Sequence, residues 1–122
     1  MVTKSRTNTF PENRVGESMA FYGRYGCLTG GKRPFMVNDG TKVVEDHSKS
    51  HYYTDTWIID LLTLEWIKIS DNFKPGLVYH AQTMYSPQLM YIFGGINSLR
   101  FPPGDMREVT FMSSSQQSIN MR

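Results

Sequence analysis

Two stretches of this sequence repeat one pattern: SMAFYGRYGCLTGG at residues 18–31 and HAQTMYSPQLMYIFGG at residues 80–95. Each predicts a strand, a break, a second strand and a pair of glycines, because short runs rich in β-branched and aromatic residues between turn residues are typical of β-strands. The second strand of each copy is expected to end at its glycine pair, where a positive φ costs little. The repeat therefore predicts two hairpins.

The segment between the two copies predicts further strands. Trp57–Asp60 and Trp66–Ile69 are strand-like runs, and the connection Leu61–Glu65 is short enough to keep them adjacent and antiparallel. After a turn at Pro75 and Gly76, the strand pattern begins again. No stretch shows a helical period, so the fold class expected is all-β with antiparallel sheets.

Lys32–Tyr53 is a polar stretch in which no strand pattern is evident. It is interpreted as a long insertion after the first glycine pair, and removing roughly a dozen of its residues restores a repeat period of about 50 residues. A shorter insertion, Ile96–Gly104, follows the second glycine pair. Both copies are thus expected to extend a loop at the same place.

Several elements recur in a fixed succession: a hydrophobic run ending in two glycines, a loop, a strand with an acidic residue, and a tryptophan strand. In this sequence they are Gly30-Gly31, Asp55–Asp60, Thr63, Trp66–Ile69, Tyr79-His80 and Tyr91–Gly95. This succession resembles the Kelch repeat. The resemblance covers Arg14 to about Phe111 and implies antiparallel β-propeller blades of Kelch type in an incomplete ring.

The resemblance implies structural roles for the residues that recur. The glycine pairs are expected where a Cβ would collide with a neighbouring blade, and the tryptophans between packed sheets, each with its indole nitrogen on a carbonyl. A single histidine near a blade turn is expected to be structural rather than a ligand. The residues assigned to this structural motif are Gly30, Gly31, Trp57, Asp60, Trp66, His80, Gly94 and Gly95.

The expected organisation has four parts. Residues 1–13 form a flexible amino-terminal segment, and residues 14–70 form the first repeat with its insertion at 32–53. Residues 71–111 form a partial second repeat, in which Arg107–Phe111 is the third strand. Residues 112–122 are a polar tail, which is considered too polar to supply a fourth strand. Two blades leave two sheet faces uncovered, so three explanations are considered: a truncated relative of a larger protein, which is favoured, self-association that completes the blades, or a partner that supplies the missing blades.

Composition excludes several classes of function. The net charge is only +2 and no run of five like charges occurs, so neither nucleic acid nor a membrane surface is an expected partner. No secretory leader or apolar membrane span is evident. Cys27 is the single cysteine, which excludes an internal disulfide and favours a reducing compartment, the cytoplasm or alternatively the nucleus.

Candidates for chemistry are few. Glu45, Asp46, His47 and His51 are the densest group of metal-ligating types, but a polar loop is the preferred interpretation, so no metal and no cofactor are expected. Some Kelch proteins are copper oxidases with a cysteine–tyrosine cofactor, but Cys27 lacks the accompanying histidine pair. Cys27 also lies in a predicted strand, where a buried thiol is inert. The chain is therefore not expected to be an enzyme.

The function expected is that of a non-enzymatic Kelch interaction module or scaffold with a protein partner. The two insertions would emerge on one face, where arginine and tyrosine, the types that dominate interaction hot spots, form a patch. The patch residues are Arg33, His47, Tyr52, Tyr53, Arg100 and Phe101. Two alternatives remain: a fragment of a catalytic Kelch propeller, such as a sugar epimerase or a metal-dependent enzyme, and a remnant without independent function.

Overall fold

The structure is a computed structural model that describes residues 3–97, 107–111 and 119–121. The residues that it describes form antiparallel sheets and no helix, so the predicted all-β class is confirmed. In this part of the chain there is accordingly no helix long and apolar enough to cross a membrane.

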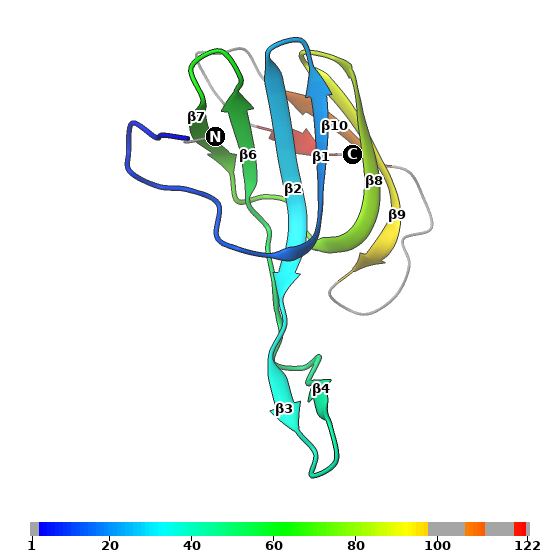
Figure 1. Cartoon of the computed structure of the whole chain (residues 1–122). Helices are drawn as coiled ribbons and strands as arrows, with labels where there is room; N and C mark the ends of the chain where they lie inside the picture. Colours follow the sequence, from blue (N-terminus) through cyan, green and yellow to red (C-terminus); the bar gives the residue numbers. More distant parts are fainter. Residues whose placement is uncertain (1–2, 98–106, 112–118, 122) are drawn as a thin grey trace.

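Two sheets make up the body of the molecule (Figure 1). The first sheet has the order β1-β2-β6-β7, and β5 also pairs with β2. Its strands are β1 (Val15–Tyr22), β2 (Tyr25–Arg33), β5 (His51–Tyr52), β6 (Thr56–Asp60) and β7 (Glu65–Ser70). The second sheet has the order β11-β10-β9-β8. Its strands are β8 (Leu77–Ser86), β9 (Leu89–Asn97), β10 (Arg107–Phe111) and β11 (Ile119–Met121).

The strands do not end at the glycine pairs, as the sequence had predicted. β2 continues through its two glycines to Arg33, and β9 continues through its own to Asn97. Gly30 keeps a partner, Glu17, and Gly94 keeps His80. A left-handed glycine bends the strand locally, but the flanking residues still pair, so the ladder continues beyond the bend.

The insertion at 32–53 contains strands that were not predicted. β3 (Met36–Asn38) and β4 (Val43–Glu45) form a two-stranded ribbon, and β5 returns to pair with the end of β2. Residues 39–42 make the turn between the ribbon strands, with Gly40 at φ 98°. An Asp-Gly pair between short apolar runs is a strong hairpin signal, and the prevailing polarity of the segment concealed it.

The carboxyl-terminal tail also differs from expectation, because β11 supplies a fourth strand to the second sheet. Ile119 and Met121 pair with Phe111 and Val109 of β10. An edge strand is held mainly by backbone hydrogen bonds, so an alternation of three residues, Ile-Asn-Met, is enough to form a short one even within a polar segment.

The amino-terminal segment lies along the edge of the first sheet. Lys4 forms an isolated parallel bridge with Glu65, in which the Lys4 amide donates to the Leu64 carbonyl at 2.9 Å and the Lys4 carbonyl accepts from the Trp66 amide at 2.8 Å. The exposed edge of β7 is thereby partly paired.

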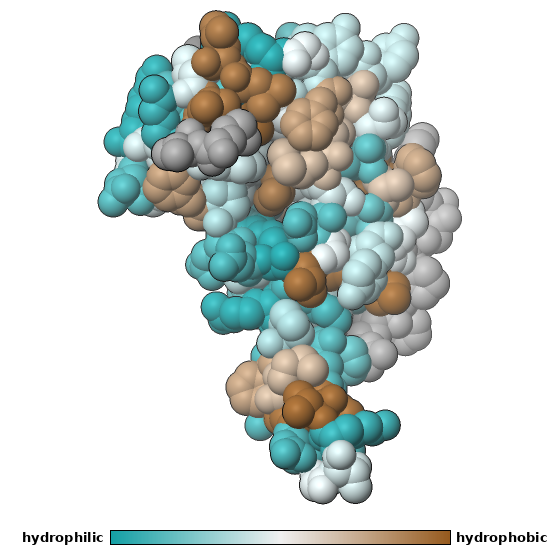
Figure 2. Space-filling view, viewed as in Figure 1, coloured by the Kyte–Doolittle hydropathy of each residue, from teal (hydrophilic) through white to brown (hydrophobic). Residues whose placement is uncertain are grey.

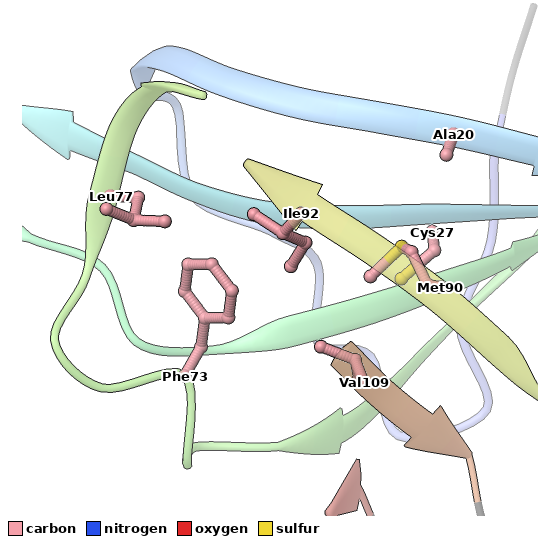
Figure 3. Close-up of a cluster of buried hydrophobic side chains, with 7 residues drawn as sticks. All are labelled: Ala20, Cys27, Phe73, Leu77, Met90, Ile92 and Val109. Atoms are coloured by element: carbon pink, nitrogen blue, oxygen red, sulfur yellow. The ribbon is translucent and has the colours of Figure 1, made fainter. Parts of the chain in front are cut away.

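The two sheets stack face to face on an apolar core (Figure 3). The core residues come from five strands and the β7–β8 connection: Ala20, Cys27, Phe73, Leu77, Met90, Ile92 and Val109. Alternation explains the packing, since every second side chain of a strand faces the same side. In β8, for example, His80, Gln82 and Met84 face the first sheet, whereas Ala81, Thr83 and Tyr85 face away. Burial of these apolar side chains is the main stabilising term of such a stack.

A buried polar cluster also joins the two sheets. The Thr29 hydroxyl donates to the Gln82 amide oxygen, and His80 Nε2 lies 2.9 Å from Thr29 Oγ1. Because a hydroxyl has a single proton, His80 is the donor in its contact with Thr29. The Gln82 amide nitrogen donates to the carbonyls of Cys27 at 2.8 Å and Ser18 at 3.1 Å. Strands that lie far apart in the sequence are thus joined by directional bonds.

Gly30 lies where the two sheets approach most closely. Its φ is 72°, and a Cβ at this position would lie 2.4 Å from both the Leu77 carbonyl oxygen and His80 Cε1. A side chain at residue 30 would therefore force the second sheet away from the first. The steric collision that the sequence predicts for a Cβ at the glycine pairs is therefore found at Gly30.

A buried ion pair joins the segment before β1 to the segment before β6. The Arg14 side chain is 2% exposed and binds both oxygens of Asp55, at 2.6 and 3.0 Å. Trp57 Nε1 donates to the same carboxylate at 2.7 Å, so its partner is an acid and not a carbonyl. Trp57 and Trp66 meet edge to face, with ring centroids 6.5 Å apart.

Asp60 closes the turn between β6 and β7. Its carboxylate pairs with Arg24, from the neighbouring hairpin turn, and accepts the Leu62 amide at 2.9 Å. The hydrogen bond from Arg24 is the largest of several interactions that lower the pKa of Asp60. The acidic residue of the repeat is therefore a turn cap in this chain.

Candidate interaction surface

The most prominent feature outside the two sheets is an arm formed by residues 33–51, which carries β3 and β4 and extends away from the body (Figure 1). Its two strands leave the first sheet side by side, because Lys32 pairs with Tyr52 and Arg33 with His51. Further out, the amide of Asp46 donates to the Phe35 carbonyl at 2.8 Å. Backbone pairing therefore recurs along the arm from its base to its ribbon.

The base of the arm is held by a partly buried ion pair. Lys32 Nζ lies 2.8 Å from Glu45 Oε1, and both side chains are largely buried. The Ser50 hydroxyl donates to Glu45 Oε2 at 2.7 Å and also accepts the Phe35 amide at 3.0 Å. Because Glu45 belongs to β4 and Lys32 to β2, these bonds fix the ribbon relative to the first sheet.

Glu45 stays ionised in this environment. Burial acts to raise the pKa of its carboxyl group, but the hydrogen bonds from Lys32 and Ser50 lower it more, and the net pKa is lowered. The ion pair is therefore fully formed at neutral pH. Breaking it by removal of Glu45 would leave the Lys32 ammonium largely buried without its carboxylate.

The tip of the arm is a compact turn stabilised by its own side chains. Asp39 Oδ1 accepts the amides of Thr41 and Lys42, each at 3.0 Å, and Asn38 Oδ1 accepts the Gly40 amide at 2.9 Å. These bonds lower the pKa of the Asp39 carboxyl group. An Asx-type turn of this kind presets the conformation of the tip.

Apolar side chains are exposed along this stiff arm. Phe35, Met36 and Val43 are all exposed, Val43 by 62%. Figure 2 shows hydrophobic atoms gathered on the arm, separated from those on the body by hydrophilic side chains. Sequence reasoning selected arginine and tyrosine and missed these three residues. The short apolar runs on either side of the Asp39-Gly40 turn signal could have identified them.

The patch predicted from the sequence is only partly assembled. Arg33 is exposed and lies 3.5 Å from Glu12. Tyr52 is half-buried, with Lys32 Nζ 5.8 Å from the centroid of its ring. Tyr53 is only 5% exposed, and its hydroxyl donates to Glu12 at 3.0 Å, while Arg14 lies against its ring. Tyr53 therefore belongs to the packed base of the arm and offers no exposed surface.

The remaining members of that patch lie apart or outside the described residues. His47 is on the arm, with Nδ1 3.2 Å from Glu45 Oε2. Arg100 and Phe101 fall in the range 98–106, outside the described residues. The two insertions are therefore not seen together on one face, and their union in a single patch stays a prediction.

The group considered for metal binding is spread along the arm. His47 contacts Glu45, but His51 packs edge to face against Tyr53, with ring centroids 4.8 Å apart. Asp46 accepts hydrogen bonds from the amide and hydroxyl of Ser48. Within the described residues, no three His, Cys, Asp or Glu side chains form a group with metal-binding geometry.

A comparison with models of known protein families finds no matching model, and a comparison with curated proteins finds no matching sequence.

Within the described residues, Cys27 and a groove beside β7 are two further places considered for chemistry. Burial raises the pKa of the Cys27 thiol, which is fully enclosed in the core, so the thiolate needed for nucleophilic attack is disfavoured. A groove of about 340 Å³ lies between the amino-terminal segment and β7. The residues described as lining it are Ser5, Arg6, Thr7, Trp66, Ile67 and Lys68. This set brings no general acid or base to the groove.

Proposed function

We propose that the chain is a non-enzymatic protein-interaction module built of two Kelch-type blades, and that its arm makes the contact with a protein partner. The Kelch likeness is supported by the sequence motif together with the strand order. Each sheet contains an antiparallel run of four strands, to which the first sheet adds β5, and each run has two left-handed glycines near the end of its second strand. In such a fold the sheets serve as a scaffold for the loops.

The observation that carries this proposal is the stiff, apolar arm. Exposed apolar side chains on a preordered element lose little conformational entropy on binding, so more of their burial energy becomes affinity. Phe35, Met36 and Val43 have this character, and the Lys32–Glu45 pair orders the ribbon that presents them. A hydrophobic centre with a charged surround, such as Arg33 and Lys42 supply, is the usual anatomy of a protein interface.

Affinity capture with matched variants tests the proposal. The arm variant combines Phe35→Ser, Met36→Ser and Val43→Ser. The control variant has Leu62→Ser, since Leu62 is 73% exposed in the β6–β7 turn on the body. We expect one set of proteins to be retained from a cell extract by the wild type and by the control, and lost with the arm variant. Equal capture by all three would exclude the arm as the binding element.

A further inference from the structure

The pairing of strands establishes which residues are equivalent in the two sheets. In the first sheet Gly30 pairs with Glu17, and in the second Gly94 pairs with His80. The two glycines have nearly the same φ, 72° and 76°. Glu17 therefore occupies in β1 the place that His80 occupies in β8, and the positions that follow correspond in order.

Where the two sheets meet, the side that the first sheet contributes is not the structural equivalent of the side that the second sheet contributes. The second sheet contributes the side that carries His80 and Gln82, whereas the first contributes the side that carries Ala20 and Thr29. By strand equivalence, the side used by the second sheet corresponds to Glu17, Met19 and Phe21 in the first. The stack is thus directional, and a further sheet of the same kind would fit at either end.

Among the described residues, both terminal sides carry exposed apolar side chains. On the first sheet Phe21 is 57% exposed, and Met19 is exposed beside it. On the second sheet Phe93 is 49% and Tyr85 73% exposed, with the Tyr91 ring edge to face against that of Tyr85. Exposed aromatic side chains on a regular sheet face are typical of a surface that is covered by a partner.

Gly94 gives the clearest sign of an unused docking position. A Cβ at Gly30 would strike the neighbouring sheet at 2.4 Å, but a Cβ at Gly94 would meet no atom of the described residues within 4 Å. Gly94 nevertheless has the same left-handed backbone, so the space for a close approach is present and unoccupied by the described residues.

We propose that a second copy of this chain docks head to tail, with the Met19–Phe21 side of its first sheet on the side of the second sheet that exposes Phe93 and Tyr85. A second copy is the occupant that brings the complementary side by construction, since the chain carries both halves of the interface. The contact between two copies is more apolar than the contact between the sheets of one chain. At equivalent positions, Met19 stands in place of Gln82 and Phe93 in place of Thr29. The inference rests on the stacked sheets of the proposed function, but not on the binding role of the arm.

Glu17 limits the strength of this contact. It stands where His80 stands inside the chain, so docking would carry a carboxylate toward Gly94 at a cost in desolvation. Reversible, concentration-dependent association is therefore expected. The variant Glu17→Gln should associate at least tenfold more tightly than the wild type.

A mixing experiment tests the direction of the contact. The variant Phe21→Lys blocks one side and Phe93→Glu blocks the other, so each alone should be monomeric in sedimentation velocity at concentrations where the wild type associates. Mixed in equal amounts, the two should form a dimer and nothing larger, because each contributes its intact side. A monomeric mixture, a self-associated single variant, or a wild type that stays monomeric to about 1 mM would overturn the proposal.

A second pair of variants does not depend on new charges. Gly94→Ala fills the open position, and Gly23→Ala is its control, since Gly23 also has a positive φ and open space around it. Gly94→Ala should weaken association at least tenfold and Gly23→Ala should leave it unchanged; equal effects would overturn the proposal. The triple arm variant should associate as the wild type does. A failed capture would therefore contradict the binding role of the arm, whereas a failed association would contradict the head-to-tail contact.

Discussion

Gly30 and Gly94 occupy the same place in the two sheets and have the same backbone conformation, but their surroundings differ. Gly30 is pressed against Leu77 and His80 of the other sheet, whereas no described residue comes within 4 Å of a Cβ placed at Gly94. A local motif can thus prescribe a backbone bend at both places, while the neighbouring sheet decides whether the missing side chain matters. Glycine is therefore required at position 94 for its backbone conformation, and at position 30 also for the close packing of the two sheets.

A second difference concerns the residues that precede these sites. Arg14 stands one residue before Val15 in β1, and Leu77 stands one residue before Val78 in β8, at equivalent positions. Arg14 makes a buried ion pair with Asp55, whereas Leu77 is fully buried in the apolar core. The first sheet therefore depends on charge pairing at a place where the second depends on hydrophobic burial.

The largest expected effect on stability comes from substituting alanine at the two equivalent glycines. Gly30→Ala should lower the free energy of unfolding by about 4 kcal/mol, because left-handed strain and a steric collision add. Gly94→Ala should cost only about 1 kcal/mol, since the strain alone remains. Urea unfolding followed by circular dichroism gives both values. Equal losses in the two variants would mean that Gly30 is required only for its conformation.

The ion pair of the first sheet should come next in size. Asp55→Ala leaves the Arg14 guanidinium and the Trp57 indole nitrogen without this carboxylate, and should cost about 3 kcal/mol. The control is Asp71→Ala, because Asp71 forms an exposed pair with Lys68 that is expected to contribute less than about 1 kcal/mol. Thermal unfolding of the three proteins measures the difference. Similar melting temperatures for both variants would contradict the role assigned to Asp55.

The polar cluster between the sheets should contribute less. Gln82→Met gives β8 the residue that β1 has at the equivalent position, Met19, and removes the bonds to Thr29, Ser18 and Cys27. The expected cost is about 1 to 2 kcal/mol, because buried polar groups lose their partner. Thr83→Val, on the opposite side of β8, serves as the control and should change stability little. An unchanged urea midpoint for Gln82→Met would show that packing alone joins the sheets.

The smallest expected effect is a dependence on pH. Burial acts to raise the pKa of Asp55, but the hydrogen bonds from Arg14 and Trp57 lower it more, so its folded pKa lies below that of the unfolded chain. The stabilisation is therefore complete above the unfolded value of about 3.9 and is lost as pH falls through the folded value. Unfolding midpoints measured from pH 7 to pH 3 should fall more steeply for the wild type than for Asp55→Ala. Parallel curves would contradict this linkage.

Local pattern was sufficient for the regular strands and insufficient for the irregular ones. β10 has the bounds predicted for it, and β6 and β7 differ from prediction by one residue at an end or two. These strands show strong alternation or β-branched runs, which depend only on neighbours in the chain. β3, β4, β5 and β11 were missed because each has two or three residues, too few for a period to emerge from a polar background.

The candidate surface was harder to predict than the strands. The sequence indicated the location of the arm, since the insertion was recognised, but it indicated the wrong side chains. Tyr53 is buried by Glu12 and Arg14, which lie about forty residues earlier, and no local pattern reports such a contact. Phe35, Met36 and Val43 are exposed because the arm projects away from the body, which only its anchoring at Lys32 and Glu45 explains.

By itself, the sequence determined the all-β class, the two hairpins and the left-handed glycines, because strand alternation and the conformational freedom of glycine act over a few adjacent residues. Only the tertiary structure decided which glycine is covered, which tyrosine is buried and which sheet sides remain open. Those outcomes depend on contacts such as His80 with Thr29, between residues 51 positions apart, where packing and desolvation act across the chain rather than along it.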